Sequence, residues 1–390
     1  MIKITLNKGK EQSALRFHPW IFSGAIRSVE GKPADGDIVE VYSNQGQFLG
    51  TGHFQNGSIT VRLFTFTKQE INSAFWLSKL QAAYNYRKNV GLAESTETNA
   101  YRLVFGEADE LPGLIIDYYN GHIVLQSHSI GMHLIRNEIV AALKKIYGEK
   151  LLTIYDKSKE TLPKNYAIGI ENSFLYGNTG KTLVKEYGNS FYVDWEKGQK
   201  TGFFIDQREN RKLLAEYSKG RTVLNTFCYT GGFSVYAAKA GAKLVHSVDS
   251  SKSAIELTKE NAELNKMDNH EEFCMDTFDF LKGKENVYDL IVLDPPAFAK
   301  SRNVSHNAVI GYKRLNTEAM KQLKSGGILF TFSCSGVIDK NLFFHTITSA
   351  AIEARRKVKI LHYLSQPADH PINVFHPEGE YLKGLVLFVE

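Results

Sequence analysis

Over the first seventy residues, hydrophobic and polar positions alternate in short runs separated by turn residues. Alternation of this kind is typical of strands, and it occurs over residues 2–6, 38–42, 47–53 and 58–66. From about Ser73 the apolar residues recur at helical spacing instead. We therefore predict a small β-rich barrel over residues 1–70, with a helix beginning just after it.

The segment from residue 71 to 187 mixes both kinds of pattern. Residues 113–117 and 123–126 are typical of a hairpin, and the spacing over 134–147 predicts a helix. A small α+β middle domain over residues 71–187 accounts for this mixture.

Residues 188–390 alternate apolar strands with amphipathic helices, which predicts a parallel sheet covered on both faces. The strands are expected at residues 222–225, 244–249, 272–276, 290–294 and 328–332. A late pair at 358–364 and 384–389 is expected to add two edge strands. The expected class is thus α/β, with a Rossmann-like C-terminal domain.

Composition narrows the function only slightly. A chain of 390 residues with 43% hydrophobic and 23% charged residues suits two or three folded domains. Because no apolar leader or spanning run occurs, we expect a soluble, cytoplasmic protein with no membrane partner. Its three cysteines show no C-x-x-C spacing, so neither a disulfide nor a metal site is expected. The net charge of +5 permits a polyanionic partner without requiring one.

A nucleotide-binding pattern opens the C-terminal domain. The first strand runs through Asn225 and Phe227 into Gly231, where glycine lets the backbone approach a ligand, and the next strand ends in Asp249. An acid in that place suits a ribose hydroxyl pair, although Asp249 could instead cap the following helix. The third glycine of a dinucleotide turn is missing, which makes a dehydrogenase the least favoured alternative.

Two later strand ends carry reactive groups. The fourth strand ends in Asp294, Pro295 and Pro296, with Phe298 beyond them, and the fifth strand leads to Cys334. In a doubly wound sheet these ends lie side by side, so Cys334 and Asp294 are predicted neighbours. A lone cysteine is more often a small buried residue than a nucleophile. Cys274, expected in mid-strand, suits that description, and Cys228 suits packing or the lining of a cofactor site.

The chain resembles the RlmI-like family of class I ribosomal RNA methyltransferases. The resemblance rests on residues 18–26, 106–114, 198–208 and 368–371, together with the Asp-Pro-Pro turn and Ser333-Cys334-Ser335. It implies a PUA domain (1–70), a middle domain (71–187) and a methyltransferase domain (188–390) that uses S-adenosylmethionine to methylate carbon-5 of a 23S rRNA cytosine. Family members often carry a lysine where this chain has Ala297. The residues predicted to bind the cofactor are Phe204, Asp206, Gln207, Asn225, Phe227, Gly231, Asp249, Asp276 and Asp294.

The resemblance also suggests a mechanism. Cys334 would add to carbon-6 of the cytosine, and Asp294 would hydrogen-bond the ring. His370 and Lys300 are weak candidates for removing the carbon-5 proton. The expected substrate contacts are Pro295, Pro296, Phe298, Lys8, Lys10 and Arg16, with Arg27 and Arg62 also available for phosphates.

Several alternatives stay open. An amino-group methyltransferase acting on an rRNA purine would use the same Asp-Pro-Pro turn without a cysteine. A non-catalytic RNA-binding assembly factor would keep the fold alone. The expected partner is large-subunit rRNA. The oligomeric state, a homodimer included, is left open.

Overall fold

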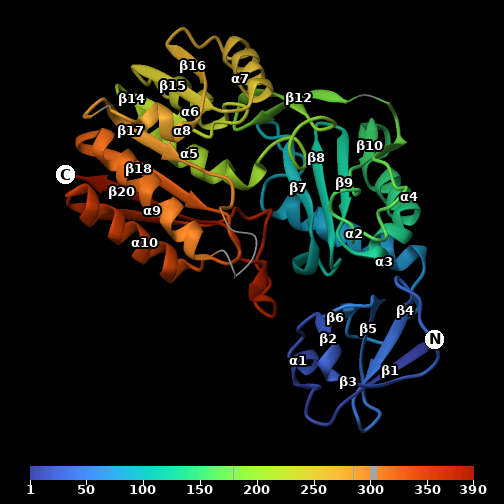
Figure 1. The fold of residues 1–390 in the computed structure, drawn as a ribbon. Coiled ribbons are helices and arrows are strands. Elements are labelled where there is room, and N and C mark those ends of the chain that lie inside the picture. The colour runs from blue at the N-terminus through green and yellow to red at the C-terminus, as the bar shows by residue number, and fades with distance from the viewer. Residues whose placement is uncertain (179, 284, 299–304) are drawn as a thin grey trace. The chain divides into compact units, whose positions relative to one another are not determined.

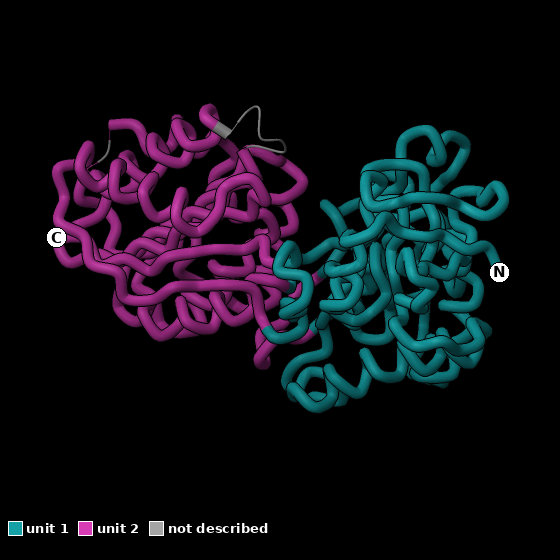
Figure 2. The backbone as a smooth tube through the Cα atoms, turned by 90° about the horizontal axis from the view of Figure 1, so that it is seen from below, with its two compact units in different colours: residues 1–184, 193–205, 368–379 teal, residues 185–192, 206–367, 380–390 magenta. Residues whose placement is uncertain are grey.

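The computed structural model describes residues 1–178, 180–283, 285–298 and 305–390 (Figure 1). Contacts within the chain divide it into two compact units, shown in different colours in Figure 2. Unit 1 comprises residues 1–184, 193–205 and 368–379, and unit 2 comprises residues 185–192, 206–367 and 380–390. The two predicted N-terminal domains thus fall in one unit, which also takes in two later segments.

A six-stranded sheet forms the N-terminal part of unit 1. Its order is β2-β6-β5-β4-β1-β3, in which β1 and β4 run parallel. The strands are β1 (Ile2–Leu6), β2 (Trp20–Phe22), β3 (Ile26–Val29), β4 (Ile38–Tyr42), β5 (Phe48–Phe54) and β6 (Ile59–Thr65), with α1 (Gln12–Leu15) between β1 and β2. Four of the strands lie where alternation predicted them. The short β2 and β3 were not predicted, because three or four residues are too few to show a period.

A second sheet in unit 1 has the order β11-β10-β9-β8-β7. Its strands are β7 (Ala100–Phe105), β8 (Leu114–Tyr119), β9 (His122–Ser127), β10 (Thr153–Asp156) and β11 (Ser173–Tyr176), and its helices are α2 (Ser73–Asn89), α3 (Ile130–Leu134) and α4 (Arg136–Tyr147). Helix α2 begins where it was predicted to, because the Asn72 side chain accepts the amides of Ala74 and Phe75. The β8–β9 hairpin is also as expected.

Unit 2 is built on a seven-stranded sheet with the order β16-β15-β14-β17-β18-β20-β19. These strands are β14 (Thr222–Thr226), β15 (Leu244–Asp249), β16 (His270–Cys274), β17 (Tyr288–Leu293), β18 (Leu323–Ser333), β19 (Val358–Leu364) and β20 (Lys383–Val389). Strands β14 to β18 pair in parallel, whereas β20 is antiparallel to both β18 and β19. The expectation of two late edge strands is therefore half wrong, because β20 inserts between β18 and β19 and only β19 lies at the edge.

Helices cover both faces of this sheet (Figure 1). Alternate residues of one strand enter different cores: Leu290 and Val292 join the helices α5 (Arg208–Ser218) and α6 (Gly232–Lys239), whereas Ile291 and Leu293 join the opposite layer. That layer contains α8 (Thr277–Leu281), α9 (Ser305–Gln322) and α10 (Lys340–Ala354). Helix α7 (Lys252–Leu264) follows β15. The continuous apolar strands are a consequence of this burial on both sides.

The hairpin of β12 (Lys181–Glu186) and β13 (Asn189–Asp194) brings a buried acid to unit 2. Both carboxylate oxygens of Glu186 accept from Arg211, at 2.8 Å each, and the Tyr236 hydroxyl donates to the same carboxylate at 3.1 Å. Burial would lower the pKa of Arg211, but the charge of Glu186 outweighs this effect and the pKa is raised.

None of the described helices is both long and apolar enough to cross a membrane.

Candidate functional site

The carboxyl ends of three neighbouring strands define one edge of the unit 2 sheet. Thr226 of β14 is paired with Leu293 of β17, and Leu293 is paired in turn with Thr331 of β18. Residues that follow these positions therefore emerge together, and they include Phe227, Asp294 and Cys334. The pairing of β17 with β18, on which the predicted proximity of Asp294 and Cys334 depended, is observed.

The glycine turn between β14 and α6 has an unusual backbone. Phe227, Tyr229 and Gly231 all have positive φ, at 51°, 49° and 79°. A Cβ atom on Gly231 would lie 2.9 Å from the Cγ2 atom of Thr258, so no other residue fits there without a shift. Left-handed non-glycine residues are costly and cluster at functional sites. The turn therefore has the backbone of a ligand-binding loop.

Asp249, at the end of β15, is half-buried and tied to that turn. Its two oxygens accept the backbone amides of Tyr229, at 3.0 Å, and Ser251, at 2.9 Å. The alternative role as a helix cap is wrong, because the cap of α7 is Ser251, whose hydroxyl accepts from Ala254. Asp249 is thus oriented by the turn rather than used to begin the helix.

Asn225 offers a buried acceptor next to the turn. Its Nδ2 donates to the Ser234 hydroxyl at 2.8 Å, while its Oδ1 has no hydrogen-bond partner among the described residues. The side chain is only 1% exposed. A buried amide oxygen without a partner costs free energy unless a ligand or water satisfies it.

The short helix η4 (Ile205–Gln207) supplies two of the polar groups predicted at this edge. Gln207 Nε2 donates to Asp294 Oδ2 at 3.0 Å, and Asn210 donates to Gln207 Oε1 at 2.6 Å. The Tyr381 hydroxyl donates to Asp206 Oδ2 at 2.6 Å. Phe204, by contrast, belongs to unit 1, where the Lys200 ammonium lies 5.6 Å from its ring centroid.

Cys334 lies in a turn just beyond β18 and is half-buried rather than sealed in the core. The buried Lys383 ammonium holds this turn, donating to the carbonyls of Ser335 and Ile338 at 2.6 Å each. Burial lowers the pKa of Lys383, whereas the negative charge of an ionised Cys334 raises it. A buried cation therefore acts electrostatically on the sulfur.

Tyr312 of α9 is affected electrostatically by both the Asp294 carboxylate and the Cys334 thiolate. Burial raises its pKa to about 12, and both Cys334 and Asp294 add to the increase through their negative charges. The Ser333 hydroxyl donates to the phenol oxygen at 3.0 Å. One buried phenol thus lies within electrostatic range of both groups.

The other two cysteines differ from Cys334. Cys228 is buried, and burial raises the pKa of its thiol far above the usual range, so it stays protonated. Cys274 was expected to be buried in mid-strand, and this is wrong, because β16 ends at Cys274 and leaves it exposed. Its strand begins two residues earlier than the predicted 272–276.

The remaining predicted residues of unit 2 are distributed around the same edge. Asp276 is exposed and caps α8, accepting from Phe278 at 2.8 Å. Pro295 is buried and Pro296 exposed, and Phe298 packs on Tyr312 with ring centroids 4.7 Å apart. Lys300, proposed as a proton acceptor, lies outside the described residues.

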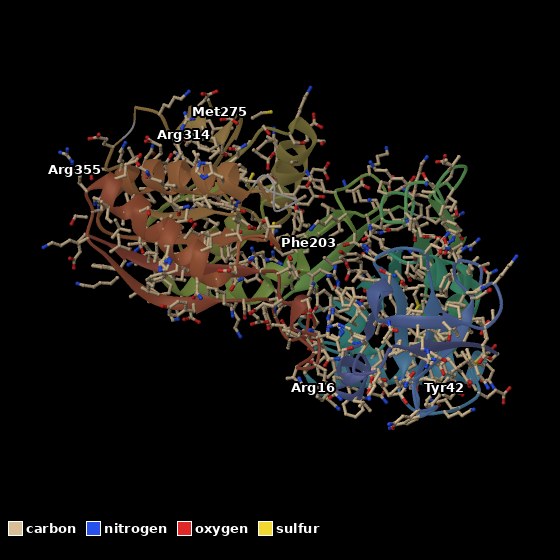
Figure 3. The ribbon with its side chains drawn as sticks, turned by 60° about the horizontal axis from the view of Figure 1, so that its bottom comes forward. Arg16, Tyr42, Phe203, Met275, Arg314 and Arg355 are labelled. Atoms are coloured by element: carbon tan, nitrogen blue, oxygen red, sulfur yellow. The ribbon has the colours of Figure 1, made fainter. Side chains whose placement is uncertain are left out.

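The basic residues predicted to contact phosphates lie on the N-terminal sheet region of unit 1. Lys8, Lys10, Arg16 and Arg27 are exposed, and Figure 3 shows the Arg16 side chain. Arg62 is only half-exposed and donates to the Ile59 carbonyl at 3.4 Å, and burial lowers its pKa. Arg62 is therefore less available to a phosphate than predicted.

Tyr312 and Lys383 were not predicted. Tyr312 sits in an amphipathic helix where aromatic residues are usually core, and Lys383 precedes a strand that was expected at the edge. Nothing in the local pattern distinguishes either from an ordinary residue.

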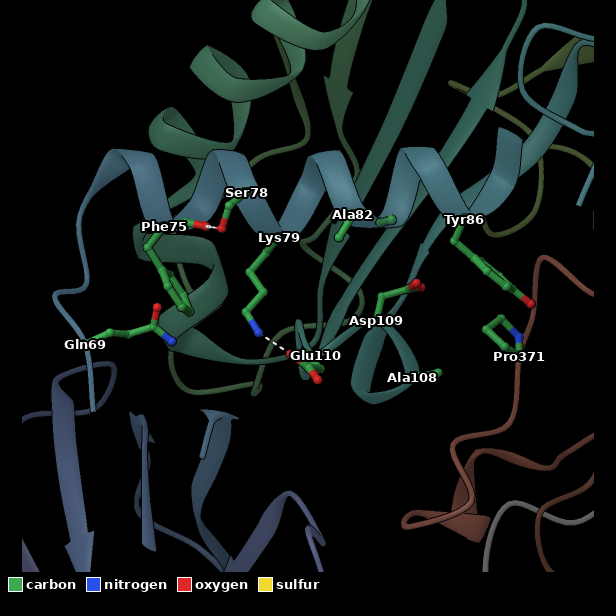
Figure 4. Close-up of a pocket in the computed structure, with 11 residues that line it drawn as sticks. Gln69, Phe75, Ser78, Lys79, Ala82, Tyr86, Ala108, Asp109, Glu110 and Pro371 are labelled. Carbon is green, nitrogen blue, oxygen red and sulfur yellow. Dashed lines mark hydrogen bonds and ion pairs between the residues drawn. The ribbon is translucent and has the colours of Figure 1, made fainter. Parts of the chain in front are cut away.

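A cavity of about 530 Å³ lies in unit 1, between α2 and the turn around η2 (Gly106–Asp109) (Figure 4). Lys79 is paired with Glu110 at its wall, and Phe75, Tyr86 and Pro371 also line it. None of the residues predicted for catalysis or cofactor binding is among its lining residues.

Comparison with known proteins identifies the family. Residues 4–66 match the PUA-like domain family, and residues 161–378, more than half of the chain, match the S-adenosylmethionine-dependent methyltransferase family. Proteins named ribosomal RNA large subunit methyltransferase I from Aeromonas hydrophila and Tolumonas auensis are 43% and 42% identical to it, and the one from Escherichia coli is 39% identical, each over 98% of both chains. The chain belongs to the S-adenosylmethionine-dependent methyltransferase family.

Solved structures agree with that assignment. A putative SAM-dependent methyltransferase from Streptococcus mutans is 29% identical and superposes with a TM-score of 0.83 over 100% of both chains. A putative methyltransferase complexed with SAH is also 29% identical, with a TM-score of 0.84 and the same coverage. The predicted fold class, a PUA-like domain followed by a Rossmann-like methyltransferase domain, is confirmed.

S-adenosylmethionine is the cofactor of this methyltransferase. The residues at the unit 2 edge fit it: Asn225 Oδ1 is a buried acceptor with no hydrogen-bond partner among the described residues, and Asp249 presents a half-buried carboxylate at the end of the neighbouring strand. The glycine turn between them permits close approach of the backbone. These residues form the candidate methyl-donor site.

Proposed function

We propose that this methyltransferase modifies carbon-5 of a cytosine in large-subunit ribosomal RNA through a covalent bond to Cys334. The printed names of its relatives support the RNA, and the pairing of β17 with β18, whose ends lead to Asp294 and Cys334, supports the chemistry. The cytoplasmic location predicted from the sequence belongs to the same proposal, because ribosomal RNA is the substrate.

Carbon-5 of cytosine is a poor nucleophile, so the ring must first be activated. The Cys334 thiolate adds to carbon-6, forming a sulfur–carbon bond and giving carbon-5 enamine character. S-adenosylmethionine, when bound, would supply the electrophilic methyl group that bonds to carbon-5, and its sulfur would leave as S-adenosylhomocysteine. Loss of the carbon-5 proton then returns its electron pair to the ring, and the sulfur–carbon bond breaks to release the thiolate.

The residues around Cys334 suit this sequence. A thiolate is favoured by nearby positive charge, which the Lys383 ammonium provides from within the fold. Asp294, in its protonated form, can donate a hydrogen bond to the ring and so offset the negative charge that the addition creates. Gln207 fixes the orientation of that carboxyl group.

No residue is assigned as the proton acceptor. His370 is buried in unit 1, where its Nδ1 lies 3.1 Å from Asp369 Oδ1, and Asp369 in turn accepts the amide of Arg102. Its contacts within unit 1 account for its position without a catalytic role.

The RNA would be bound in two parts. The target base must be unpaired or flipped out of its stack to reach the carboxyl edge of the unit 2 sheet, where Pro295, Pro296 and Phe298 can contact it. Lys8, Lys10 and Arg16, exposed on the PUA-like domain, are placed to bind phosphates.

The direct test is mechanism-based trapping. RNA containing 5-fluorocytosine should form a stable adduct with the wild-type enzyme and S-adenosylmethionine, because fluorine at carbon-5 cannot leave as a proton. Cys334→Ala should form none, and Cys274→Ser, at an exposed cysteine, should trap normally. Normal carbon-5 methylation by the Cys334 variant would refute the nucleophile assignment.

An amino-group methyltransferase is the second candidate, since Asp294, the two prolines and Phe298 could also hold an exocyclic amine. Nucleoside analysis of the methylated product distinguishes the two: 5-methylcytidine supports the cysteine mechanism, and an N-methylpurine supports the alternative. RNA that binds without any methyl transfer would instead indicate a non-catalytic assembly factor.

A further inference from the structure

Two histidines and a glutamate converge in unit 1, outside the methyltransferase site. His18 lies just before β2, while His376 and Glu378 come from the late segment that contains η6 (Pro377–Gly379). His18 Nε2 lies 3.4 Å from Glu378 Oε1, and His376 Nε2 lies 3.8 Å from Glu378 Oε2. One ligand atom from each residue falls within 4.8 Å of the others.

His376 shows that this arrangement is incomplete as an ordinary hydrogen-bond network. Its side chain is 4% exposed, and its Nε2 has no hydrogen-bond partner among the described residues. Glu378 Oε2, at 3.8 Å, is beyond hydrogen-bond distance. A buried polar atom of this kind needs an explanation, and it lies beside the carboxylate that also faces His18.

We propose that His18, His376 and Glu378 form a site for a divalent transition-metal ion of the zinc class. Two imidazoles and one carboxylate are a ligand set that zinc accepts, whereas magnesium and calcium prefer oxygen alone. Ligand atoms about 2.0–2.2 Å from zinc stand roughly 3.4 Å apart in a tetrahedron. The separations of 3.4 and 3.8 Å to Glu378 are close to this value, and its half-exposed side chain can adjust them. All three ligand atoms lie within 4.8 Å of one another, so the two imidazoles would also have to approach the ion.

His18 adds one requirement. The Trp20 amide donates to its Nδ1 at 3.2 Å, so in the neutral ring the proton resides on Nε2. Coordination through Nε2 transfers that proton to Nδ1 and breaks the bond to Trp20. Metal binding thus replaces two long hydrogen bonds of the His18 ring, one from the Trp20 amide and one to Glu378 Oε1, with a coordinate bond.

The site would link distant parts of the chain. His18 and Glu378 are 360 positions apart, so a bound ion would fasten the late segment to the N-terminal sheet region. This placement also explains why no metal site was expected from the sequence, since spacing rules detect only ligands close together along the chain. The proposed ion has a structural role and takes no part in methyl transfer.

The test is thermal unfolding of the full chain after chelator treatment, with and without one equivalent of zinc chloride. The wild type should gain several degrees in its unfolding temperature with zinc, and none with magnesium chloride. Glu378→Gln and His376→Gln should lose this response. His345→Gln, at an exposed histidine of unit 2, should keep it.

Two further measurements distinguish a loss of metal binding from a loss of folding. Glu378 is exposed on one side, so Glu378→Gln should unfold at the wild-type temperature without metal. Cobalt chloride should give the visible absorption bands of a four-coordinate ion with the wild type, and should quench Trp20, whose ring centroid lies 4.4 Å from that of His376. Absence of any zinc response in the wild type, or a response that persists in both variants, would overturn the proposal.

Discussion

Gln207 Nε2 donates a hydrogen bond to Asp294 Oδ2 over 3.0 Å, joining the short helix before α5 to the end of β17. Asn210 holds the other end of the same amide, at 2.6 Å. Asp294 is therefore oriented by a residue 87 positions earlier in the chain, and that residue belongs to one of the stretches that carry the family resemblance, residues 198–208. Gln207 is a positioning residue for the carboxyl group that the proposed mechanism uses.

Replacing Gln207 by glutamate keeps the size of the side chain and removes its donor. We expect Gln207→Glu to lower the rate of adduct formation with 5-fluorocytosine RNA roughly tenfold, the effect of about 1.4 kcal/mol of misplaced hydrogen bonding. The measurement is single-turnover trapping at saturating cofactor. Glu209→Gln, at the exposed neighbour, should trap at the wild-type rate. Equal losses in both variants would indicate a general disturbance of this segment and would contradict a specific role for Gln207.

Lys383 allows the electrostatic part of the mechanism to be tested. Lys383→Met removes the buried cation that favours the Cys334 thiolate, so alkylation of Cys334 by iodoacetamide at neutral pH should slow roughly tenfold, or about 1.4 kcal/mol. Raising the pH should restore much of the rate, because more thiolate then forms. Peptide mass spectrometry is needed, since the exposed Cys274 also reacts.

Lys383→Arg is the matched control, because it keeps the charge while changing the donor geometry. It should retain most of the alkylation rate. If the methionine and arginine variants slow equally, Lys383 acts by holding the carbonyls of Ser335 and Ile338, and its charge is unimportant.

The sequence predicted the strands and the acidic residues at the candidate site, but it did not predict the buried residues that act on them electrostatically. Asp249 and Asp294 were found because apolar runs end at the ligand-binding edge of a parallel sheet, a rule that depends only on local pattern. Lys383 and Tyr312 could not be found in this way. The position of Lys383 depends on β20 entering between β18 and β19, and that of Tyr312 depends on how α9 packs on the sheet. Both are long-range features that local propensity does not encode.

The cysteines show the same limit. Cys334 was selected by its position after a strand, whereas Cys274 was misplaced because the strand register was shifted by two residues. A period of two residues locates a strand but does not fix its ends. The exposure of a residue at a strand end is therefore beyond what the pattern can predict.

Asp249 should govern cofactor affinity. Asp249→Asn keeps one acceptor for the amides of Tyr229 and Ser251 but removes the charge. Loss of a charge-assisted hydrogen bond costs about 1.5–3 kcal/mol, so the Kd for S-adenosylhomocysteine should rise by roughly ten- to a hundredfold. Isothermal titration calorimetry measures this. An unchanged Kd would exclude Asp249 from the cofactor site.

Glu186 should govern the stability of unit 2. Glu186→Gln removes the carboxylate that pairs with the buried Arg211 cation, which costs about 3–5 kcal/mol. Urea unfolding followed by circular dichroism measures the loss. Asp279→Asn breaks the exposed pair with Lys282 and should cost under about 1 kcal/mol. Comparable losses in the two variants would show that burial of the Glu186 pair is irrelevant to its contribution.

The basic residues of the PUA-like domain should set the salt dependence of RNA binding. Each neutralised phosphate of single-stranded RNA contributes about 0.7 to the slope of log affinity against log salt. Changing Lys8, Lys10 and Arg16 to alanine should therefore lower affinity for rRNA fragments and reduce the slope by roughly 2, while the Kd for S-adenosylhomocysteine stays unchanged.

A second variant with three lysines replaced distinguishes the effect of where the charges lie from the effect of the net charge. Lys144, Lys145 and Lys150 are also exposed in unit 1, and changing them to alanine likewise reduces the formal net charge from +5 to +2, since 5 − 3 = 2. If phosphates contact the N-terminal residues, only the first triple changes the salt slope, because counterion release depends on which cations meet the RNA. If both triples weaken binding equally, the attraction is a property of the net charge, and the PUA-like domain makes no specific phosphate contacts through these side chains.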